Sequence, residues 1–171
     1  MSAQPLTPAQ QQLLAVWQQH TFAEFVQRDA AAALATMSDD PYVLLIPAGT
    51  GGVGRDGVYD FYANAFLPNI PQDMENIPIS QTITEDKIIE EAIFRFTHNE
   101  QVDWMIPGVP ATGKQVEMVV LGLIQFKDGK VASEHLYWDQ ATVLSQLGVV
   151  DHPAAAAGQR TIPKLREIMG L

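Results

Sequence analysis

The sequence contains no cysteine, and this absence excludes several kinds of chemistry at once. Without a thiol there is no disulfide, no thiolate nucleophile and no zinc site with cysteine ligands. Basic residues are scarce as well, because 10 Lys and Arg stand against 20 Asp and Glu, which gives a net charge of -10. A face that binds nucleic acid or an anionic membrane needs clustered Lys and Arg. The composition therefore predicts that neither nucleic acid nor a membrane is a partner.

Long apolar runs are also missing. No stretch of the chain approaches the roughly 18 apolar residues of a membrane-spanning helix. The first residues, MSAQPLTPAQQQLL, contain no basic cluster and no apolar segment, so we expect no secretory signal. The default expectation is a cytoplasmic protein. Its 171 residues are enough for one domain with a full core.

Sequence motifs for phosphate, metal or cofactor binding are absent. The glycine-rich segment AGTGGVGRDG (residues 48–57) fits neither the Walker pattern nor GxGxxG, so it is expected to be a flexible loop. His98 and His135 could form a site with two histidines, but no HxH or HExxH pattern accompanies them. We therefore expect neither a metal nor a cofactor. His20, in the first predicted helix, and His152, near the C-terminus, are expected to be exposed to solvent.

The order of the predicted elements indicates the fold class. Leu14, Trp17, Thr21 and Phe25 recur at helical spacing, which predicts an amphipathic helix over about residues 8–27. Two further helices are expected, at 30–37 and 54–66. The predicted strands lie at 42–46, 77–85, 88–99, 116–126 and 131–138, and a helix follows at 141–147. Helices followed by antiparallel strands indicate an α+β fold with helices on one face of a curved sheet.

Such a sheet wraps around its helices as a cone, and the interior of a cone is a natural site for a small apolar ligand. We expect one domain over residues 8–151. Residues 1–7 are predicted to be a flexible tail, and residues 152–171 a linker followed by a short C-terminal helix.

Polar chemistry is concentrated in residues 130–148, KVASEHLYWDQATVLSQLG, which are predicted to be a strand that continues into a helix. In a regular strand His135, Tyr137 and Asp139 point to one face, where they could bind and polarise a carbonyl group. A carboxylate in an apolar cavity has a raised pKa and can transfer a proton near neutral pH. Alternatively, Asp139 is the N-cap of the helix, which lowers its pKa, and His135 is a partly buried histidine with a structural hydrogen bond.

Several aromatic residues and one more histidine are candidates for the wall of this cavity. Phe94, Phe96 and His98 share one side of a predicted strand, and Trp104 lies in a loop that could cover the cavity. The full set of predicted ligand contacts is Tyr137, His98, Trp104, Phe94, Phe96, Tyr62, Tyr42 and Trp17. The same aromatic residues could instead form an ordinary core.

Two segments resemble a known family. DWMIPGVPATGKQVEM (103–118) and EHLYWDQATVLSQLGVVD (134–151) resemble the SnoaL-like branch of the NTF2-like superfamily, which includes polyketide and ester cyclases. They are similar above all to the NTF2-like domain found beside dienelactone hydrolases in some bacterial proteins. The resemblance implies an NTF2-like cone, with N-terminal helices packed in the concave face of a curved antiparallel or mixed sheet. It also implies a homodimer that pairs through the outer face of the sheet, and it matches Asp139 to the acid/base aspartate of the cyclases.

Two functions follow from these expectations. In the first, the protein is an acid/base catalyst that acts on a small carbonyl compound or lactone, as a cyclase, isomerase or hydrolase does, with Asp139 as acid/base and His135 as its hydrogen-bonding partner. In the second, it is a non-catalytic dimer that binds a small apolar or aromatic ligand or assists a hydrolase. Hydrolase chemistry of its own is not implied, because the chain has neither GxSxG nor a cysteine nucleophile.

Overall fold

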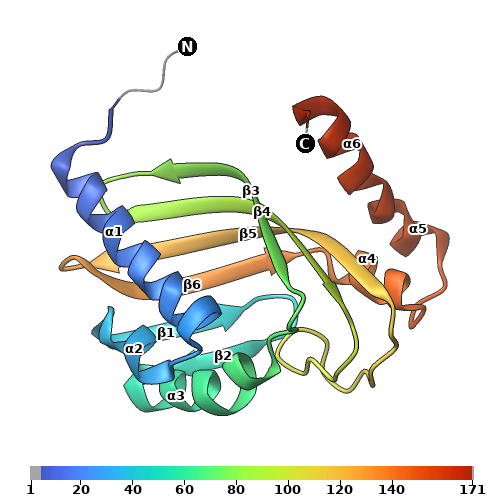
Figure 1. Cartoon of the computed structure of the whole chain (residues 1–171), viewed down its shortest axis with the longest axis horizontal. Helices are drawn as coiled ribbons and strands as arrows, with labels where there is room; N and C mark the ends of the chain where they lie inside the picture. Colours follow the sequence, from blue (N-terminus) through green and yellow to red (C-terminus); the bar gives the residue numbers. More distant parts are fainter. Residues whose placement is uncertain (1–4, 171) are drawn as a thin grey trace.

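The computed structural model describes residues 5–170 and shows a curved, six-stranded sheet with the N-terminal helices laid on one face (Figure 1). The strand order is β2-β1-β6-β5-β4-β3. Strands β1 and β6 are parallel, and all other neighbours are antiparallel. The strands are β1 (Met37–Leu45), β2 (Thr50–Val53), β3 (Glu75–Ile83), β4 (Lys87–Thr97), β5 (Gln115–Lys127) and β6 (Lys130–Trp138). The predicted α+β class is confirmed, and of the two kinds of sheet that the resemblance implied, antiparallel or mixed, the sheet is mixed.

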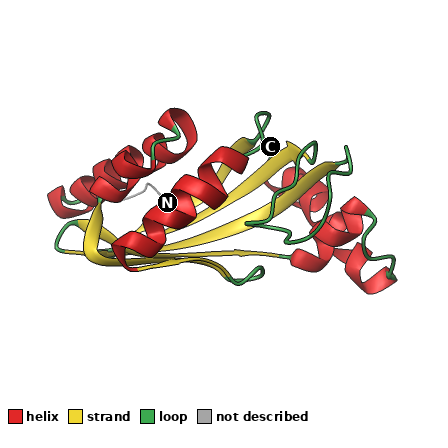
Figure 2. Ribbon diagram, turned by 90° about the horizontal axis from the view of Figure 1, so that it is seen from below, coloured by secondary structure: helices red, strands yellow, loops and turns green. Residues whose placement is uncertain are grey.

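The helices lie mainly in the concave face of the sheet (Figure 2). Helix α1 begins after Thr7, whose hydroxyl accepts a hydrogen bond from the backbone N–H of Gln10, while the Gln10 side chain accepts one from the Thr7 N–H. The helical segments of the first half are α1 (Pro8–Phe22), η1 (Ala23–Gln27), α2 (Ala30–Ala35), α3 (Gly54–Asp60), η2 (Phe61–Phe66) and η3 (Leu67–Asn69). Those after the sheet are α4 (Gln140–Leu147), α5 (Pro153–Ala156), η4 (Ala157–Arg160) and α6 (Thr161–Met169).

Two helices end in a π-helical turn. Helix α1 continues into the π-helix η1, and α3 continues into the π-helix η2. A π-helical turn changes the direction in which the following side chains point, and such turns occur frequently at functional sites. Here η1 carries Glu24 and η2 carries Tyr62, and both side chains are buried.

The glycine-rich segment is not the expected flexible loop. Residues 50–53 pair with β1 as β2, Gly54 begins α3, and close backbone contact explains Gly51 and Gly52. A Cβ atom on Gly51 would lie 2.0 Å from the carbonyl oxygen of Val43, and one on Gly52 would lie 2.2 Å from that of Gly57. The sequence pattern therefore reflects packing between β1, β2 and α3.

The C-terminal helices pack beside the outer face of the sheet. Ile162 of α6 is buried, and the Arg166 guanidinium donates to the Glu117 carboxylate of β5. None of the helices in residues 5–170 has the length and apolar composition that a membrane crossing requires. The tail predicted over residues 1–7 falls partly on residues 1–4, which lie outside the described residues.

Candidate functional site

A cavity lies between α1, η2 and the concave face of the sheet. It has a volume of about 60 Å³, which is room for roughly four to six water-sized groups. Its wall is mostly apolar and includes Phe61 and Phe66 from η2 and Val120 and Ile124 from β5. Two buried carboxyls, Glu24 and Glu134, also line it. Acidic groups in an apolar wall are costly to bury, so each requires a compensating partner.

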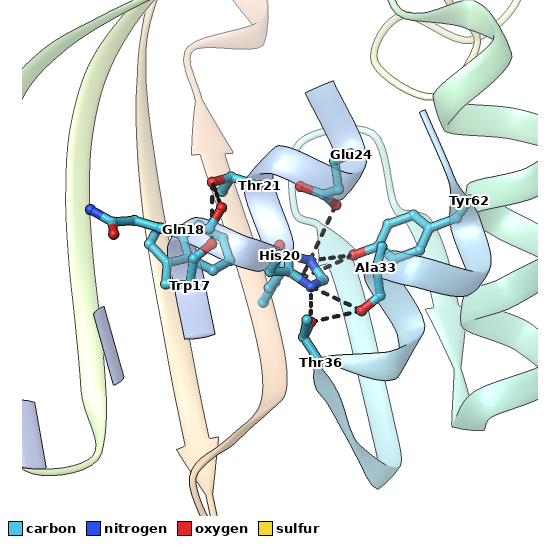
Figure 3. A network of polar contacts seen from close by, with 9 residues as sticks. Trp17, Gln18, His20, Thr21, Glu24, Ala33, Thr36 and Tyr62 are labelled. Carbon is cyan, nitrogen blue, oxygen red and sulfur yellow. Dashed lines mark hydrogen bonds and ion pairs between the residues drawn. The ribbon is translucent and has the colours of Figure 1, made fainter. Parts of the chain in front are cut away.

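The compensating partner is His20 of α1, whose ring is fully buried behind the two carboxyls. The Nε2 atom lies 3.0 Å from Oε1 of Glu134 and 3.3 Å from Oε1 of Glu24. The opposite ring nitrogen, Nδ1, lies 2.6 Å from Oγ1 of Thr36 and 3.2 Å from the carbonyl oxygen of Ala33. Figure 3 shows Glu24 of η1, Tyr62 of η2, and Ala33 and Thr36 at the end of α2 around the imidazole.

The contacts of both ring nitrogens favour a protonated ring. Nδ1 lies next to the Ala33 carbonyl, which can only accept, and the Thr36 hydroxyl can accept from Nδ1 while it donates to Ala33 O at 2.7 Å. Nε2 faces two carboxyls, which favours a proton there as well. The surroundings therefore favour the imidazolium form. Burial alone would lower the pKa of His20, but the charges of Glu24 and Glu134 and their hydrogen bonds outweigh it and hold this pKa well above its usual value.

The two carboxyls do not have equal surroundings. Glu134 Oε1 accepts from the Tyr62 hydroxyl at 3.0 Å as well as from the ring of His20. Glu24 lies beside one edge of the same ring. Burial raises the pKa of the Glu24 carboxyl; the positive charge of His20 opposes this rise and the negative charge of Glu134 adds to it. Glu24 thus keeps its proton to higher pH than an ordinary glutamate does.

Tyr62 is a donor that does not ionise in this place. Burial raises the pKa of its hydroxyl well above the usual value, and the nearby carboxyls raise it further. Its oxygen also lies 3.2 Å from Nε2 of His20. The neutral hydroxyl therefore joins the imidazolium and Glu134 in one network.

His20, Glu24 and Glu134 lie close enough together to hold a metal ion, since their possible ligand atoms are all within 4.8 Å of one another. A metal ion would require the lone pair of His20 Nε2. That atom is positioned to donate to two carboxyls, and the raised pKa of the ring favours its protonated form. The described geometry fits an ion-pair network better than a set of metal ligands.

Comparison with known families identifies the fold and the family together. The sequence profile described as SnoaL-like polyketide cyclase matches residues 9–147, which include α1, the whole sheet and α4. The chain belongs to the SnoaL-like polyketide cyclase family. A comparison with curated proteins finds no match.

Several solved structures share this fold. A protein of Jannaschia sp. CCS1 described as a SnoaL-like polyketide cyclase has a TM-score of 0.69 and 18% identity, over 87% of this chain and 100% of that one. TsrD from Streptomyces laurentii has a TM-score of 0.61 and 18% identity, over 85% and 100%. A protein of Acidithiobacillus ferrooxidans described as a polyketide cyclase has the same two values, over 86% and 100%. At these identities the likeness shows the fold alone.

In this SnoaL-like chain Asp139 lies outside the cavity. Its Oδ1 accepts from the backbone N–H groups of Ala141 at 3.0 Å and Thr142 at 3.2 Å, and its Oδ2 accepts from the Thr142 hydroxyl. The residue is exposed and caps α4, which is the alternative that the sequence left open. The catalytic role predicted for Asp139 stays a prediction, and this position does not support it.

The predicted row of His135, Tyr137 and Asp139 does not point into the cavity. On β6 the residues that line the cavity are Glu134 and Leu136, so their neighbours His135 and Tyr137 point to the outer face. There His135 Nε2 lies 3.1 Å from the hydroxyl of Tyr42, which is 38% exposed. The prediction of which β6 side chains face the cavity was wrong, because the buried Glu134 faces inward and His135 faces outward.

The other predicted contacts are divided between cavity and core. Trp17, Tyr62 and Phe94 line the cavity. Phe96 is buried in the core, and Trp104 is buried with its indole N–H donating to the Asn69 carbonyl at 3.1 Å. His98 is buried too: its Nδ1 lies 3.2 Å from the Thr112 hydroxyl, its Nε2 has no partner among the described residues, and burial lowers its pKa.

His20, Glu24 and Glu134 were missed by the sequence analysis, and the expectation of an exposed His20 was wrong. The buried side of α1 and η1 includes Leu13, Trp17, His20 and Glu24. Of the expected set, Trp17 is buried there, and Thr21 and Phe25 line the cavity beside it. The spacing of His20 from Trp17 and Glu24 was the available signal, because residues three and four apart share a helix face. Nothing in the local sequence pointed to Glu134 as their partner.

Proposed function

We propose that this protein is an acid/base catalyst that transfers protons on a small, partly apolar carbonyl compound or lactone, with Glu24 as the catalytic group. The observation that carries the proposal is the position of Glu24: a buried carboxyl in the wall of an apolar cavity, with its pKa raised by burial. A raised pKa brings the acid and base forms of a carboxyl closer to equal population at neutral pH, which favours proton transfer in both directions.

The groups around Glu24 allow it to take up and release a proton. The His20 imidazolium and the Glu134 carboxylate compensate each other's charge, and the Tyr62 hydroxyl donates to Glu134. Glu134 accepts from two donors, the His20 ring and the Tyr62 hydroxyl, and these contacts hold it in place in the network. Two carboxyls in one site with different surroundings is the arrangement that assigns separate roles to acid and base groups.

The chemistry is proton transfer beside a carbonyl group. In its base form Glu24 takes a proton from the carbon next to the carbonyl, and the electron pair of the broken C–H bond moves to the carbonyl oxygen as an enolate. The resulting carboxylic acid returns the proton to carbon or oxygen. Exchange, isomerisation and aldol-type ring closure all begin with this step, and membership in the SnoaL-like polyketide cyclase family is consistent with it. The size of the cavity limits the reacting part of the substrate to a small group.

The test is hydrogen–deuterium exchange at the carbon next to the carbonyl, followed by NMR in heavy water for a panel of small cyclic ketones and lactones. Glu24→Gln keeps the shape of the side chain and removes the titrating group, so it should slow exchange by about 100-fold or more. Asp139→Asn is the control and should leave exchange unchanged. Exchange at the wild-type rate in Glu24→Gln would contradict the assignment.

A binding protein without turnover is the second candidate. The observation that favours it is the closed set of contacts around His20, since both ring nitrogens already have protein partners. This reading predicts that a compound from the panel binds to the wild-type protein with no catalysed exchange.

A further inference from the structure

The chemical composition of the cavity wall is unusual for a neutral ligand. Six aromatic side chains line it: Trp17, Phe25, Phe61, Tyr62, Phe66 and Phe94. Three carboxyls line it as well, those of Glu24, Glu90 and Glu134. Among the described residues of this wall there is no Lys, Arg or His. Aromatic faces combined with carboxyls are the groups with which proteins bind organic cations.

The carboxyls lie at different places along the cavity. Glu24 and Glu134 are buried beside His20, at the inner side. Glu90 lines both the cavity and an open groove beside it, together with Asn76, so it lies where the cavity meets the surface. An entering cation therefore meets negative charge at the entrance before it reaches the aromatic walls.

The positive charge of His20 balances only one of the two carboxylates beside it when both are ionised, so a second cation would be stabilised there. One imidazolium faces two carboxyls, Glu24 and Glu134. The aromatic wall already contacts a cation of the protein itself, because the Trp17 ring stacks on the His20 ring with centroids 5.4 Å apart and planes inclined by 12°. A ligand cation in the cavity would have the same kind of neighbour.

We propose that the cavity binds a small organic cation, an ammonium group with apolar substituents, through its aromatic faces and through Glu90, Glu24 and Glu134. This inference deepens the proposed function, on which it rests: it names the substrate class as a carbonyl compound that carries an amine. The volume of about 60 Å³ matches an ammonium group with a few methyl substituents.

The decisive comparison uses two ligands of the same shape and different charge. Choline carries a trimethylammonium group, and 3,3-dimethylbutan-1-ol is its neutral counterpart with carbon in place of nitrogen. In isothermal titration calorimetry of the wild-type protein, the dissociation constant for choline should be lower than that for the alcohol by a factor of about ten or more. Equal affinities, or no binding of either compound, would overturn the proposal.

A pair of neighbouring variants localises the effect. Glu90→Gln removes the charge at the entrance and should weaken choline binding several-fold without changing the affinity for the alcohol. Glu91→Gln is the matched control, because it removes the same charge from the same strand. Glu91 lines the open groove but not the cavity, and it accepts from the Ser80 hydroxyl at 3.3 Å. If both variants weaken choline equally, the general negative charge of the surface is responsible and the cavity site is wrong.

The outcome is separable from that of the proposed function. Choline has no carbonyl group, so its binding tests charge recognition alone. If choline binds no better than the alcohol while Glu24→Gln still abolishes exchange in neutral ketones, the cation proposal fails and proton transfer by Glu24 stands. If choline binds more tightly than the alcohol and no ketone is exchanged, cation binding in the cavity stands and proton transfer by Glu24 fails.

Discussion

The Nε2 atom of His20 lies 3.0 Å from Oε1 of Glu134, and this contact joins the first helix of the chain to the last strand of the sheet. Both side chains are buried, so neither charge is stabilised by water. Breaking a buried ion pair by removing one partner costs about 3–5 kcal/mol, because the other charge is left without compensation. The pair is therefore a requirement for the fold as well as for the proposed chemistry.

The first prediction concerns His20→Gln. The glutamine keeps hydrogen-bonding groups but cannot carry the positive charge, so Glu134 and Glu24 would face each other uncompensated. We expect the free energy of unfolding to fall by about 3–5 kcal/mol, measured by urea denaturation. His135→Gln is the control on the outer face and should change stability by about 0.5 kcal/mol or less. Similar losses in the two variants would contradict the buried ion pair.

The second prediction is the pH dependence of this stabilisation. A histidine whose pKa is raised on folding contributes stability that is complete below its unfolded pKa of about 6.5 and is lost as pH rises through the folded pKa. Since the pKa of His20 lies well above its usual value, the stability difference between wild type and His20→Gln should be largest below about pH 6.5 and should shrink in alkaline solution. Denaturation curves over a pH series measure this difference. A gap that widens with rising pH would show that the ring is buried in its neutral form.

The third prediction isolates the Tyr62 hydroxyl. Tyr62→Phe keeps the buried ring and removes the donor to Glu134, and an unsatisfied buried group costs about 1–3 kcal/mol. Tyr59→Phe is the matched control, because Tyr59 lies in the adjoining α3 and is 46% exposed. Thermal and urea unfolding of both variants should show the loss only for Tyr62→Phe. Equal stability of the two variants would mean that the hydrogen bond to Glu134 contributes nothing.

The fold was predictable because its signals are local. Asp128 and Gly129 form the tight turn between β5 and β6 with positive φ angles of 52° and 74°, as a DG pair between apolar runs indicates. The period of the apolar residues placed the long strands, whereas β2 was missed because its glycines resemble a loop. Gly51 and Gly52 allow the backbone of β2 to lie close to β1 and α3, and this contact is apparent only in the folded structure.

The site was not predictable for a related reason. In the segment SEHLYW polar residues occupy both alternating positions, so the sequence of β6 does not decide whether Glu134 or His135 points inward. The partner that makes a buried Glu134 tolerable is His20, which lies at the other end of the chain. His20 was left out of the expected buried face of α1 for the same reason: a histidine is read as a polar surface residue until its buried partners are known.

The fourth prediction separates Asp139 from the cavity. Asp139→Ala removes the cap of α4, which typically costs about 1 kcal/mol. Asp29→Ala provides a comparison, because Asp29 caps α2 through the same two kinds of backbone hydrogen bond. Both variants should lose similar stability in urea, and neither should change proton exchange or choline binding. A large loss of exchange in Asp139→Ala alone would restore the catalytic role predicted from the sequence.

The fifth prediction concerns the outer face of the sheet, which we propose as the surface of a homodimer. Four large side chains, Tyr42 and Leu44 on β1, Ile46 directly after β1 and Leu121 on β5, are each between 36% and 38% exposed. On this face β6 lies between them and adds His135 and Tyr137, and a gathering of exposed apolar and aromatic side chains on a sheet favours a protein–protein interface. Light scattering at micromolar concentration should therefore give twice the chain mass of 18.8 kDa.

Leu121→Lys tests this surface, because it places a charge among the four apolar side chains and should convert the dimer into a monomer. Val26→Lys is the control, since Val26 is 66% exposed on η1, on the helical side of the molecule. A monomeric wild-type protein would refute the dimer, and a dimer that survives Leu121→Lys would place the interface elsewhere. Because Glu134 and His135 alternate along β6, the proposed interface and the cavity lie on opposite faces of the same strand. Leu121→Lys should consequently abolish pairing while choline affinity is retained.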